Sequence, residues 1–507
     1  MIMLLSGVHM TYISKSKYCL AWQCQKLLWL NKYKPELKTE DGTLDSRFET
    51  GQIVGNLAKG LLGDYVDVTS YTSDKQLNLD KMLQTTKECI SNNISNICEA
   101  SFVSDDLFCS VDILHKEMDG YAIYEVKSST HASQIYSVDI AYQKYVLEQC
   151  GINVTGTYLV CINSKYVREN DLDIHQLFTI IDVSEDVATE IQNVPYILEK
   201  SRNTYQSTEE PVKNIGSHCR NPYACPYWDY CTRNISKPSV FNLYRLPFLK
   251  ALEYYQNGYV TYDDLILNPK ITNPKHIRQI SHQLSDLGTY VDKDGIRNFI
   301  DTLSYPIYFL DFETTQDVIP QYTGSKPYQQ IPFQYSLHYI EEECGTLQHK
   351  EFLAESGIDP RRTIAESLCN DIPMNVCVTA YNKSFECSRL KELSETFPDL
   401  AEHLLNISNN IKDLLEPFQA GYYYNRAMGG SFSIKSVLPA IFPDDPALDY
   451  HNLEQIHNGS EAMSIFPRIK DMPPEEQEIA RHNLLKYCEL DTYAMVKVWE
   501  ELINVAK

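Results

Sequence analysis

The chain has 507 residues, and its 45 lysines and arginines stand against 68 aspartates and glutamates, which gives a net charge of −23. This length exceeds one ordinary domain, so we expect about three. An acidic chain disfavours non-specific nucleic-acid binding, but it does not exclude a nuclease, whose metal site needs carboxylates. No run of about 18 apolar residues occurs, which predicts a cytoplasmic protein without a membrane-spanning helix.

The first ten residues read MIMLLSGVHM. They contain neither a basic segment nor a clear cleavage site, so we expect no signal peptide. Met10 is an alternative start of translation, because the patterned sequence begins directly after it. The fifteen cysteines are scattered, and in a chain without an export signal most are expected to be reduced core residues.

A polar pattern follows in the next part of the chain. LFCSVDILHK predicts a strand that carries Asp112, and YAIYEVKSS, after a short turn, predicts a second strand. Glu125 and Lys127 are two apart on that strand and share a face, and the helix predicted after it carries Gln143. Two carboxylates can bind Mg²⁺ or Mn²⁺ while a lysine activates water. The alternative for the Glu-x-Lys pair alone is an ordinary surface ion pair.

Together these residues resemble the core of the PD-(D/E)xK nucleases, in particular the RecB-like branch that includes AddB and the CRISPR-adaptation nucleases. The resemblance covers roughly residues 11–235 and implies a restriction-endonuclease-like fold. It further implies that Asp112 and Glu125 hold a metal ion and that Lys127 and Gln143 serve catalysis.

One feature departs from that branch, which carries a metal-binding histidine on an early helix. Here the helix reads RFETGQIVGNLAKG, and the matching region holds Gly55 and Asn56. Glu49 on the same helix is the candidate substitute. We therefore expect a third metal ligand that is missing or replaced.

Three cysteines, Cys219, Cys225 and Cys231, lie six residues apart in GSHCRNPYACPYWDYC. Iron–sulfur members of the RecB-like branch take one cysteine from before the nuclease core and three from after it. This resemblance implies that Cys24, with Cys19 as the fallback, joins the three in holding a [4Fe–4S] cluster. The alternatives are zinc, which also accepts four thiolates, and no metal at all.

Residues 236–303 contain segments such as FNLYRLPFLKALEYY and PKHIRQISHQLSDLG, which predict a helical connector. Residues 304–507 restart with a buried-strand pattern, YPIYFLDFETT, and then alternate strands and helices. They end in a long helix that opens on paired prolines followed by acids, as helix starts prefer.

Three acidic patterns occur in this last segment. Asp311 and Glu313 end the first strand and point to one side, so they can bind a divalent metal; a solvated strand end is the alternative. NKSFECSRLKEL predicts a turn into a helix with Glu386 in its first turn. Tyr487 and Asp491 share a face of the last helix, as they also would on an ordinary amphipathic helix.

The order of these patterns resembles the three exonuclease motifs of the DnaQ-like DEDD superfamily, and the tyrosine marks its DEDDy subgroup. The resemblance implies two metal ions, a catalytic Tyr487 that orients the attacking water, and a shared set of metal ligands. Those ligands are Asp311, Glu313, Glu386 and Asp491.

Glu386 departs from the family, which normally has aspartate there, and one extra methylene can shift the geometry and lower the rate. Asn382 precedes it at the family's spacing. The segments around Asp413 and Lys435 resemble the superfamily's linking segments, and we interpret both residues as structural support.

We therefore expect an α/β protein with a restriction-endonuclease-like domain at 1–235, a helical connector at 236–303, and a ribonuclease-H-like domain with a mixed sheet at 304–507. The whole resembles an uncharacterised bacterial family that joins these two folds. Its expected function is Mg²⁺- or Mn²⁺-dependent hydrolysis of nucleic acid, DNA rather than RNA, by a 3′–5′ exonuclease site and a RecB-like nuclease site in repair or defence. The alternative is a nucleic-acid-binding or scaffold protein with degenerate sites.

Overall fold

The computed structural model describes residues 12–39 and 44–507, so Met10 lies outside the described residues. These residues form helices and several sheets, which confirms the expected α/β class. Within the described ranges, no helix combines the length and the apolar character needed to cross a bilayer.

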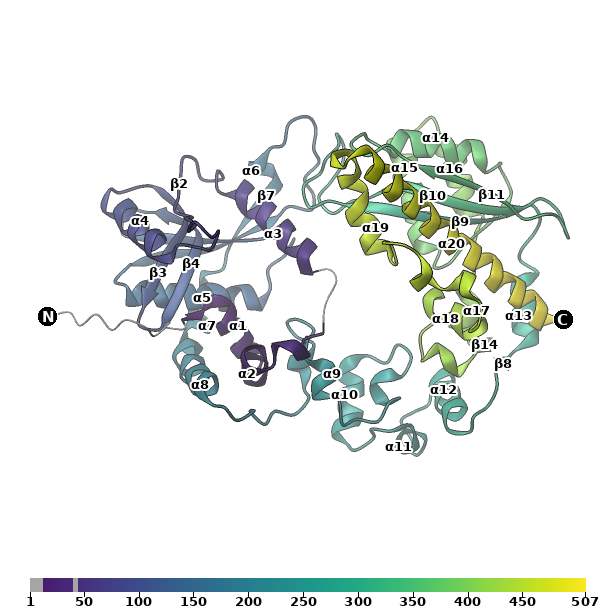
Figure 1. The fold of residues 1–507 in the computed structure, drawn as a ribbon, viewed down its shortest axis with the longest axis horizontal. Coiled ribbons are helices and arrows are strands. Elements are labelled where there is room, and N and C mark those ends of the chain that lie inside the picture. The colour runs from purple at the N-terminus through teal and green to yellow at the C-terminus, as the bar shows by residue number, and fades with distance from the viewer. Residues whose placement is uncertain (1–11, 40–43) are drawn as a thin grey trace. The chain divides into compact units, whose positions relative to one another are not determined.

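The chain divides into two compact units, which Figure 1 draws from purple to yellow along the sequence. The N-terminal unit comprises residues 1–234 and 318–328, and the C-terminal unit comprises 235–317 and 329–507. Residues 236–303, expected as a separate connector, therefore belong to the C-terminal unit. Both units are discontinuous in sequence.

Among the described residues, the N-terminal unit forms a seven-stranded mixed sheet with the order β2-β3-β4-β5-β6-β7, and β1 pairs with β4. Its strands are β1 (Ile13–Ser14), β2 (Val66–Asp67), β3 (Asn96–Ser104), β4 (Leu107–Lys116), β5 (Tyr121–Lys127), β6 (Val154–Ile162) and β7 (Phe178–Asp182). Its helices are α1 (Lys15–Gln23), α2 (Gln25–Tyr33), α3 (Leu44–Ala58), α4 (Leu79–Ser91), α5 (Gln134–Gln149), α6 (Ile174–Leu177), α7 (Ser184–Glu190), α8 (Val194–Gln206) and α9 (Trp228–Cys231).

Two core clusters hold the N-terminal unit together. One joins α5 to the sheet through residues such as Val138 and Ile123, and the other joins α3 to the sheet through Val54 and Ile113. Helices on both faces leave the long strands buried, as a mixed sheet requires.

Residues 318–328 contribute to the core of the N-terminal unit. Val318 and Ile319 are buried in the cluster that contains α3. The Arg168 side chain donates to the carbonyl oxygen of Pro320 at 2.9 Å, and the Arg168 backbone N–H donates to that of Ser325 at 3.0 Å. The segment is therefore packed and hydrogen-bonded there.

The C-terminal unit contains, in its described residues, a five-stranded sheet with the order β11-β10-β9-β12-β13. β10 is antiparallel to β11 and β9, whereas β9, β12 and β13 are parallel. The strands are β9 (Ile307–Gln316), β10 (Gln330–Ile340), β11 (Gln348–Leu353), β12 (Cys377–Ala380) and β13 (Ile411–Asp413), with a separate pair of β8 (Tyr290–Val291) and β14 (Tyr423–Tyr424). The helices are α10 (Phe248–Gln256), α11 (Tyr262–Ile266), α12 (Pro274–Leu284), α13 (Lys293–Ile300), α14 (Arg361–Asp371), α15 (Ser384–Thr396), α16 (Ala401–Asn409), α17 (Glu416–Ala420), α18 (Ile434–Ile441), α19 (Gly459–Ile465) and α20 (Pro474–Ala506).

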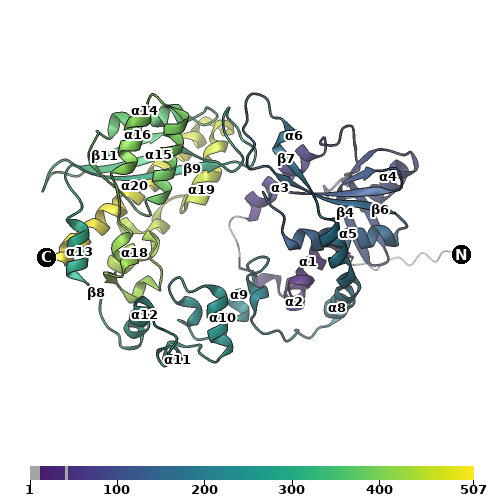
Figure 2. The ribbon, with the colours of Figure 1, turned by 180° about the vertical axis from the view of Figure 1, so that it is seen from behind.

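Helices cover both faces of this sheet as well. Figure 2 shows α14, α15 and α16 in front of the sheet and α20 behind it. Phe309 of β9 packs in the cluster that contains α20, whereas Leu310 and Phe312 pack in the cluster that contains α14, α15 and α16. Because side chains alternate along a strand, Asp311 and Glu313 continue the row of Phe309 toward α20.

Candidate functional site

Four acids form a carboxylate centre, which we define as Asp311, Glu313, Glu386 and Asp491; Asp311 is partly exposed, and the other three are buried. Asp311 and Glu313 come from β9 and Asp491 comes from α20, and one oxygen of each lies within 4.8 Å of the other two. Glu386 comes from the first turn of α15, and its side chain is only 2% exposed. The structure therefore brings Asp311, Glu313 and Asp491 together, and Glu386 lies close enough for its charge to raise the pKa of Asp311.

The turn before α15 positions Glu386. Asn382 adopts a left-handed φ of 70°, and its backbone N–H donates to Asp413 at 2.9 Å, as that of Lys383 does at 3.3 Å. Asp413 thus supports the turn from β13, in the structural role expected for it. Among the described residues, Glu386 Oε2 is a buried oxygen without a hydrogen-bond partner, which is costly unless a cation is bound.

Burial and mutual repulsion raise the pKa values in the carboxylate centre. Burial raises the pKa of Asp311, and the charges of its neighbours, of which Asp491 is the strongest, raise it further. Burial also raises the pKa of Glu313 to about 8 and that of Glu386 to about 8. It raises the pKa of Asp491 to about 6, although a hydrogen bond from Tyr450 opposes the change. At neutral pH the centre therefore favours either bound protons or a bound cation.

We expect the metal-free protein to lose stability as the pH rises. Glu313 has a pKa of about 8 in the folded protein and an ordinary value of 4.5, so the folded state holds this proton more tightly. The resulting stabilisation is complete below the unfolded pKa and is lost as the pH rises through the folded pKa. In a chelator, the unfolding midpoint of the wild type should therefore fall several degrees between pH 5 and pH 8, relative to Glu313→Gln.

Scanning calorimetry measures this difference, and Mg²⁺ should raise the wild-type midpoint more at pH 8 than at pH 5. Glu313→Gln is the matched control because it keeps the shape of the side chain but cannot ionise. The same pH dependence in both proteins would contradict the expectation.

Two tyrosines and a lysine border the carboxylate centre. Tyr450 donates a hydrogen bond to Asp491 Oδ1 at 2.6 Å, and Lys435 Nζ donates one to the hydroxyl of Tyr487 at 3.2 Å. Burial raises the pKa of Tyr487, so its hydroxyl stays protonated. Lys435 and Tyr450 also line a cavity of about 670 Å³, together with His457. The centre thus borders a cavity of the size that ligand sites have.

A second polar centre, the lysine–carboxylate centre, lies between β4, β5 and α5 in the N-terminal unit. Lys127 Nζ lies 2.6 Å from Glu125 Oε1 and 2.9 Å from Asp139 Oδ2. Gln143 donates to the other oxygen of Glu125 at 2.7 Å. Asp112 accepts a hydrogen bond from a backbone N–H of β5 at 2.7 Å. The four residues predicted from the sequence thus lie together, and Asp139 joins them.

Lys15, the first residue of α1, contacts the carboxylates of this second centre. Its Nζ lies 3.0 and 3.3 Å from the two oxygens of Glu125 and 3.7 Å from Asp112 Oδ1. Burial raises the pKa of Asp112 to about 7. Burial would also raise the pKa of Glu125, but the charges of Lys127 and Lys15 hold it below its ordinary value. The lysine–carboxylate centre therefore already contains its own cations.

The early helix of the RecB-like resemblance corresponds to α3. Gly55 and Asn56 lie on it, and Glu49, the candidate substitute ligand, has an exposed side chain. Another acid, Glu99, lies near Asp112, because its negative charge helps to raise the pKa of Asp112. Glu99 has a φ of 56°, and the pairing of β3 with β4 skips both residues. A strained strand residue beside a polar centre is typical of functional sites.

The four predicted cysteines, Cys24, Cys219, Cys225 and Cys231, line one pocket of the N-terminal unit. Cys24 separates α1 from α2, and Cys231 ends α9. Burial raises the pKa of Cys225 to about 11, and the charges of the three other thiols act in the same direction. The thiols are therefore close enough to interact, and a bound cation would favour their ionised form.

Apolar side chains surround the cysteine pocket. Leu27, Leu30 and Tyr227 are buried in one cluster, against which Cys24, Cys225 and Cys231 pack. Cys19, the fallback ligand, packs instead against the cluster that contains α5. The structure thus favours Cys24 over Cys19 as the fourth cysteine of the set.

Sequence reasoning missed several residues that contact the predicted ones. Lys15 is 110 positions from Glu125, and Tyr450 is 41 positions from Asp491, so no local pattern indicates either contact. Asp139 did carry a signal, because it precedes Gln143 by one helical turn and therefore shares its face.

Comparisons with known proteins identify similar sequences of unknown function. A family model described as a domain of unknown function, DUF2779, matches residues 308–433. The chain is similar to the uncharacterized protein UU173 of Ureaplasma parvum, with 29% identity over 236 residues, which is 40% of this chain and 32% of that protein. It is also similar to the uncharacterized protein MG366 homolog of Mycoplasma pneumoniae, with 29% identity over 211 residues, or 38% and 31% of the two chains. The match thus spans about a third of the length of these relatives.

Proposed function

We propose that the C-terminal unit is a metal-dependent nuclease that hydrolyses phosphodiester bonds of nucleic acid, with a ribonuclease-H-like fold of the DnaQ type. The observation that carries this proposal is the carboxylate centre, in which β9 and α20 bring three acids within 4.8 Å of one another and α15 adds the buried Glu386, whose charge acts on Asp311. The sheet order, with β9 in the middle and parallel strands on one side, supports the same fold. The motif order favours 3′–5′ exonuclease action, and we propose DNA rather than RNA as the substrate.

The residues of the carboxylate centre fit divalent cations. They offer only oxygen ligands, which Mg²⁺ and Mn²⁺ prefer, and Glu386 Oε2 has no donor within the described residues. Such ions, when bound, would activate water and stabilise the leaving oxygen. Tyr487 can hold that water through its protonated hydroxyl, which Lys435 fixes in place. Burial raises the pKa values of Glu313 and Asp491, and the charge of Lys435 opposes this rise, which favours their ionised forms.

For the N-terminal unit, the specific arrangement of Lys15 favours a second function. A metal ion shared by Asp112 and Glu125 would bind the carboxylate oxygens that the Lys15 ammonium contacts. The ion would therefore have to displace Lys15. The lysine–carboxylate centre therefore fits a metal less well than the carboxylate centre does. We propose that this unit has the RecB-like fold but binds or positions nucleic acid without cleaving it.

We further propose that the cysteine pocket holds a [4Fe–4S] cluster. A tetrahedral zinc ion with Zn–S bonds of about 2.3 Å needs sulfurs roughly 3.8 Å apart. Among the described residues, the groups whose ligand atoms all lie within 4.8 Å of one another contain no cysteine. The four sulfurs are therefore spread more widely than a single ion requires, which supports the larger cluster.

Cleavage of labelled oligonucleotides tests the proposed nuclease. We expect the whole chain, with Mg²⁺ or Mn²⁺, to shorten 5′-labelled single-stranded DNA stepwise from its 3′ end, and to stop at a phosphorothioate block there. Lys127→Ala should keep this rate within about threefold, because the lysine–carboxylate centre takes no part. If the wild type also cut the DNA internally and Lys127→Ala did not, the lysine–carboxylate centre would be a second active centre. No metal-dependent cleavage of DNA or RNA would leave the binding or scaffold role for the whole protein.

A further inference from the structure

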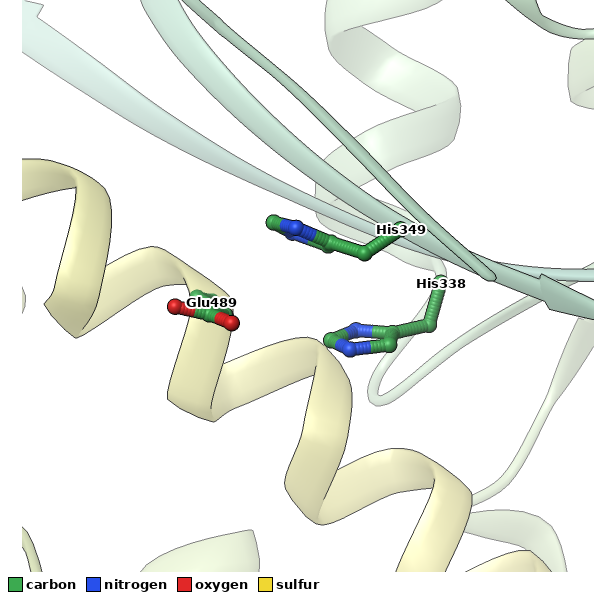
Figure 3. A group of neighbouring side chains, drawn as sticks. All are labelled: His338, His349 and Glu489. Carbon is green, nitrogen blue, oxygen red and sulfur yellow. The ribbon is translucent and has the colours of Figure 1, made fainter. Parts of the chain in front are cut away.

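A second group of possible metal ligands lies on the α20 side of the C-terminal sheet, apart from the carboxylate centre. His338 of β10 and His349 of β11 are direct partners in the antiparallel pairing. Glu489 of α20 faces them, as Figure 3 shows. One ligand atom of each residue lies within 4.8 Å of those of the other two. Two neighbouring strands and a helix therefore converge on one point.

Hydrogen bonds fix which nitrogens of the two histidines are free. Thr492 Oγ1 contacts the Glu489 carbonyl oxygen at 3.1 Å, Ser336 Oγ at 2.7 Å and His338 Nδ1 at 2.8 Å. A carbonyl oxygen only accepts, so the single Thr492 proton goes to it. Ser336 and His338 must then both donate to Thr492.

The same reasoning assigns the proton of the second histidine, His349. Since the Ser336 proton points to Thr492, its oxygen must accept from His349 Nε2, which lies 2.9 Å away. His338 therefore carries its proton on Nδ1 and His349 carries its proton on Nε2. The opposite nitrogen of each ring keeps a lone pair. Metal-binding histidines are characteristically held in this way, with the second ring N–H donating to a protein oxygen.

We propose that His338, His349 and Glu489 bind a zinc-class divalent ion. Two imidazole nitrogens and one carboxylate are a ligand set that suits zinc, whereas the all-oxygen carboxylate centre suits Mg²⁺ or Mn²⁺. His338 and Glu489 also line a cavity of about 350 Å³, which leaves room for a water ligand. Burial and the nearby His349 lower the pKa of His338 to about 4, so His338 is a neutral ligand at neutral pH.

An ion at this site would join strand β11 and strand β10 to α20. Glu489 lies between Tyr487 and Asp491 on that helix, so the ion would also hold the helix that carries both residues. Among the described residues, the ion pair that the metal would disturb is that of Glu489 with Lys486, at 2.6 Å, and the Lys486 side chain is 54% exposed. An exposed pair of this kind contributes little stability. The inferred role of the ion is structural.

Equilibrium dialysis of the whole chain against Zn²⁺, followed by elemental analysis, tests the site. His349→Ala and Glu489→Gln should each bind one zinc fewer per chain than the wild type, through at least about a 100-fold loss of affinity. Other zinc sites are the same in all these proteins, so they cancel in the comparison. Lys486→Ala is the matched control, because it removes the ion-pair partner of Glu489 but no ligand, and it should keep the zinc.

Thermal unfolding is a second measurement, which distinguishes loss of zinc from poor folding of a variant. Zinc should raise the unfolding midpoint of the wild type and of Lys486→Ala by about 5 °C, but not that of Glu489→Gln, whose changed side chain is partly exposed. Equal zinc content in the wild type, His349→Ala and Glu489→Gln would overturn the proposal. The three side chains would then form a hydrogen-bonded network alone.

Discussion

Replacing Asp311 with asparagine should lower metal-dependent cleavage by about 10³-fold or more, because metal ions supply several kcal/mol of transition-state stabilisation. Asp311 lies at the middle of the carboxylate centre, where the charges of Asp491, Glu386 and Glu313 all raise its pKa. Asparagine keeps the shape of the side chain but removes the charge that binds cations. Initial rates on a 5′-labelled oligonucleotide, at saturating Mn²⁺, measure the loss.

The free energy of unfolding distinguishes a loss of metal binding from misfolding of the variant. Removing one of several mutually repelling charges should raise the free energy of unfolding of the metal-free protein by about 1 kcal/mol. The Asp311→Asn protein should therefore be inactive and at least as stable as the wild type. Glu351→Gln, an exposed carboxylate of the same sheet, is the control and should change neither quantity. A rate for Asp311→Asn within threefold of the wild type would rule out the carboxylate centre as the active site.

Replacing Cys225 with serine should remove the iron and destabilise the N-terminal unit. The free energy of binding a structural metal is roughly 10 kcal/mol or more, and it contributes directly to folding, so we expect a loss of about 5 kcal/mol or more. The cysteine pocket joins Cys24, next to α1 and α2, to the segment that carries Cys219 and Cys231. Iron and sulfide analysis, together with limited proteolysis of these two segments, measures the result.

Cys19→Ser is the matched control, because Cys19 precedes α2 like Cys24 but packs against the cluster that contains α5. That variant should keep its iron, whereas Cys24→Ser should behave like Cys225→Ser. Cleavage by the C-terminal unit should survive in all three variants. If Cys225→Ser lost cleavage and iron together, the two units would not be independent in the way proposed here.

Local periodicity carried most of what the sequence could predict. The alternation of a strand placed Asp311 and Glu313 on one face, and the helical repeat placed Tyr487 and Asp491 on one face. These patterns survive in the structure because each depends only on a single strand or helix. The place of Cys24 came from family resemblance, since nothing in the spacing of 195 residues between it and Cys219 indicates the pocket.

The remaining contacts depend on tertiary packing, which the sequence does not display. His338 and His349 are partners only in one register of β10 with β11, and a shift by one residue would turn one ring to the opposite face. Lys15 reaches Glu125 of β5 because β1, which directly precedes Lys15, pairs with β4, the neighbour of β5. The contact of Tyr450 with Asp491 likewise depends on tertiary packing and cannot be predicted from the sequence. Each contact requires the folded arrangement of elements before it can be read from residue types.

The placement of residues 318–328 has a consequence for any attempt to separate the two units. The segment lies between β9 and β10 in sequence, yet Val318 and Ile319 complete the apolar cluster around α3. A fragment that ends near residue 235 would therefore leave that cluster uncovered, and Arg168 would lose its partner at Pro320. Neither unit can therefore be cut out as one continuous stretch of polypeptide.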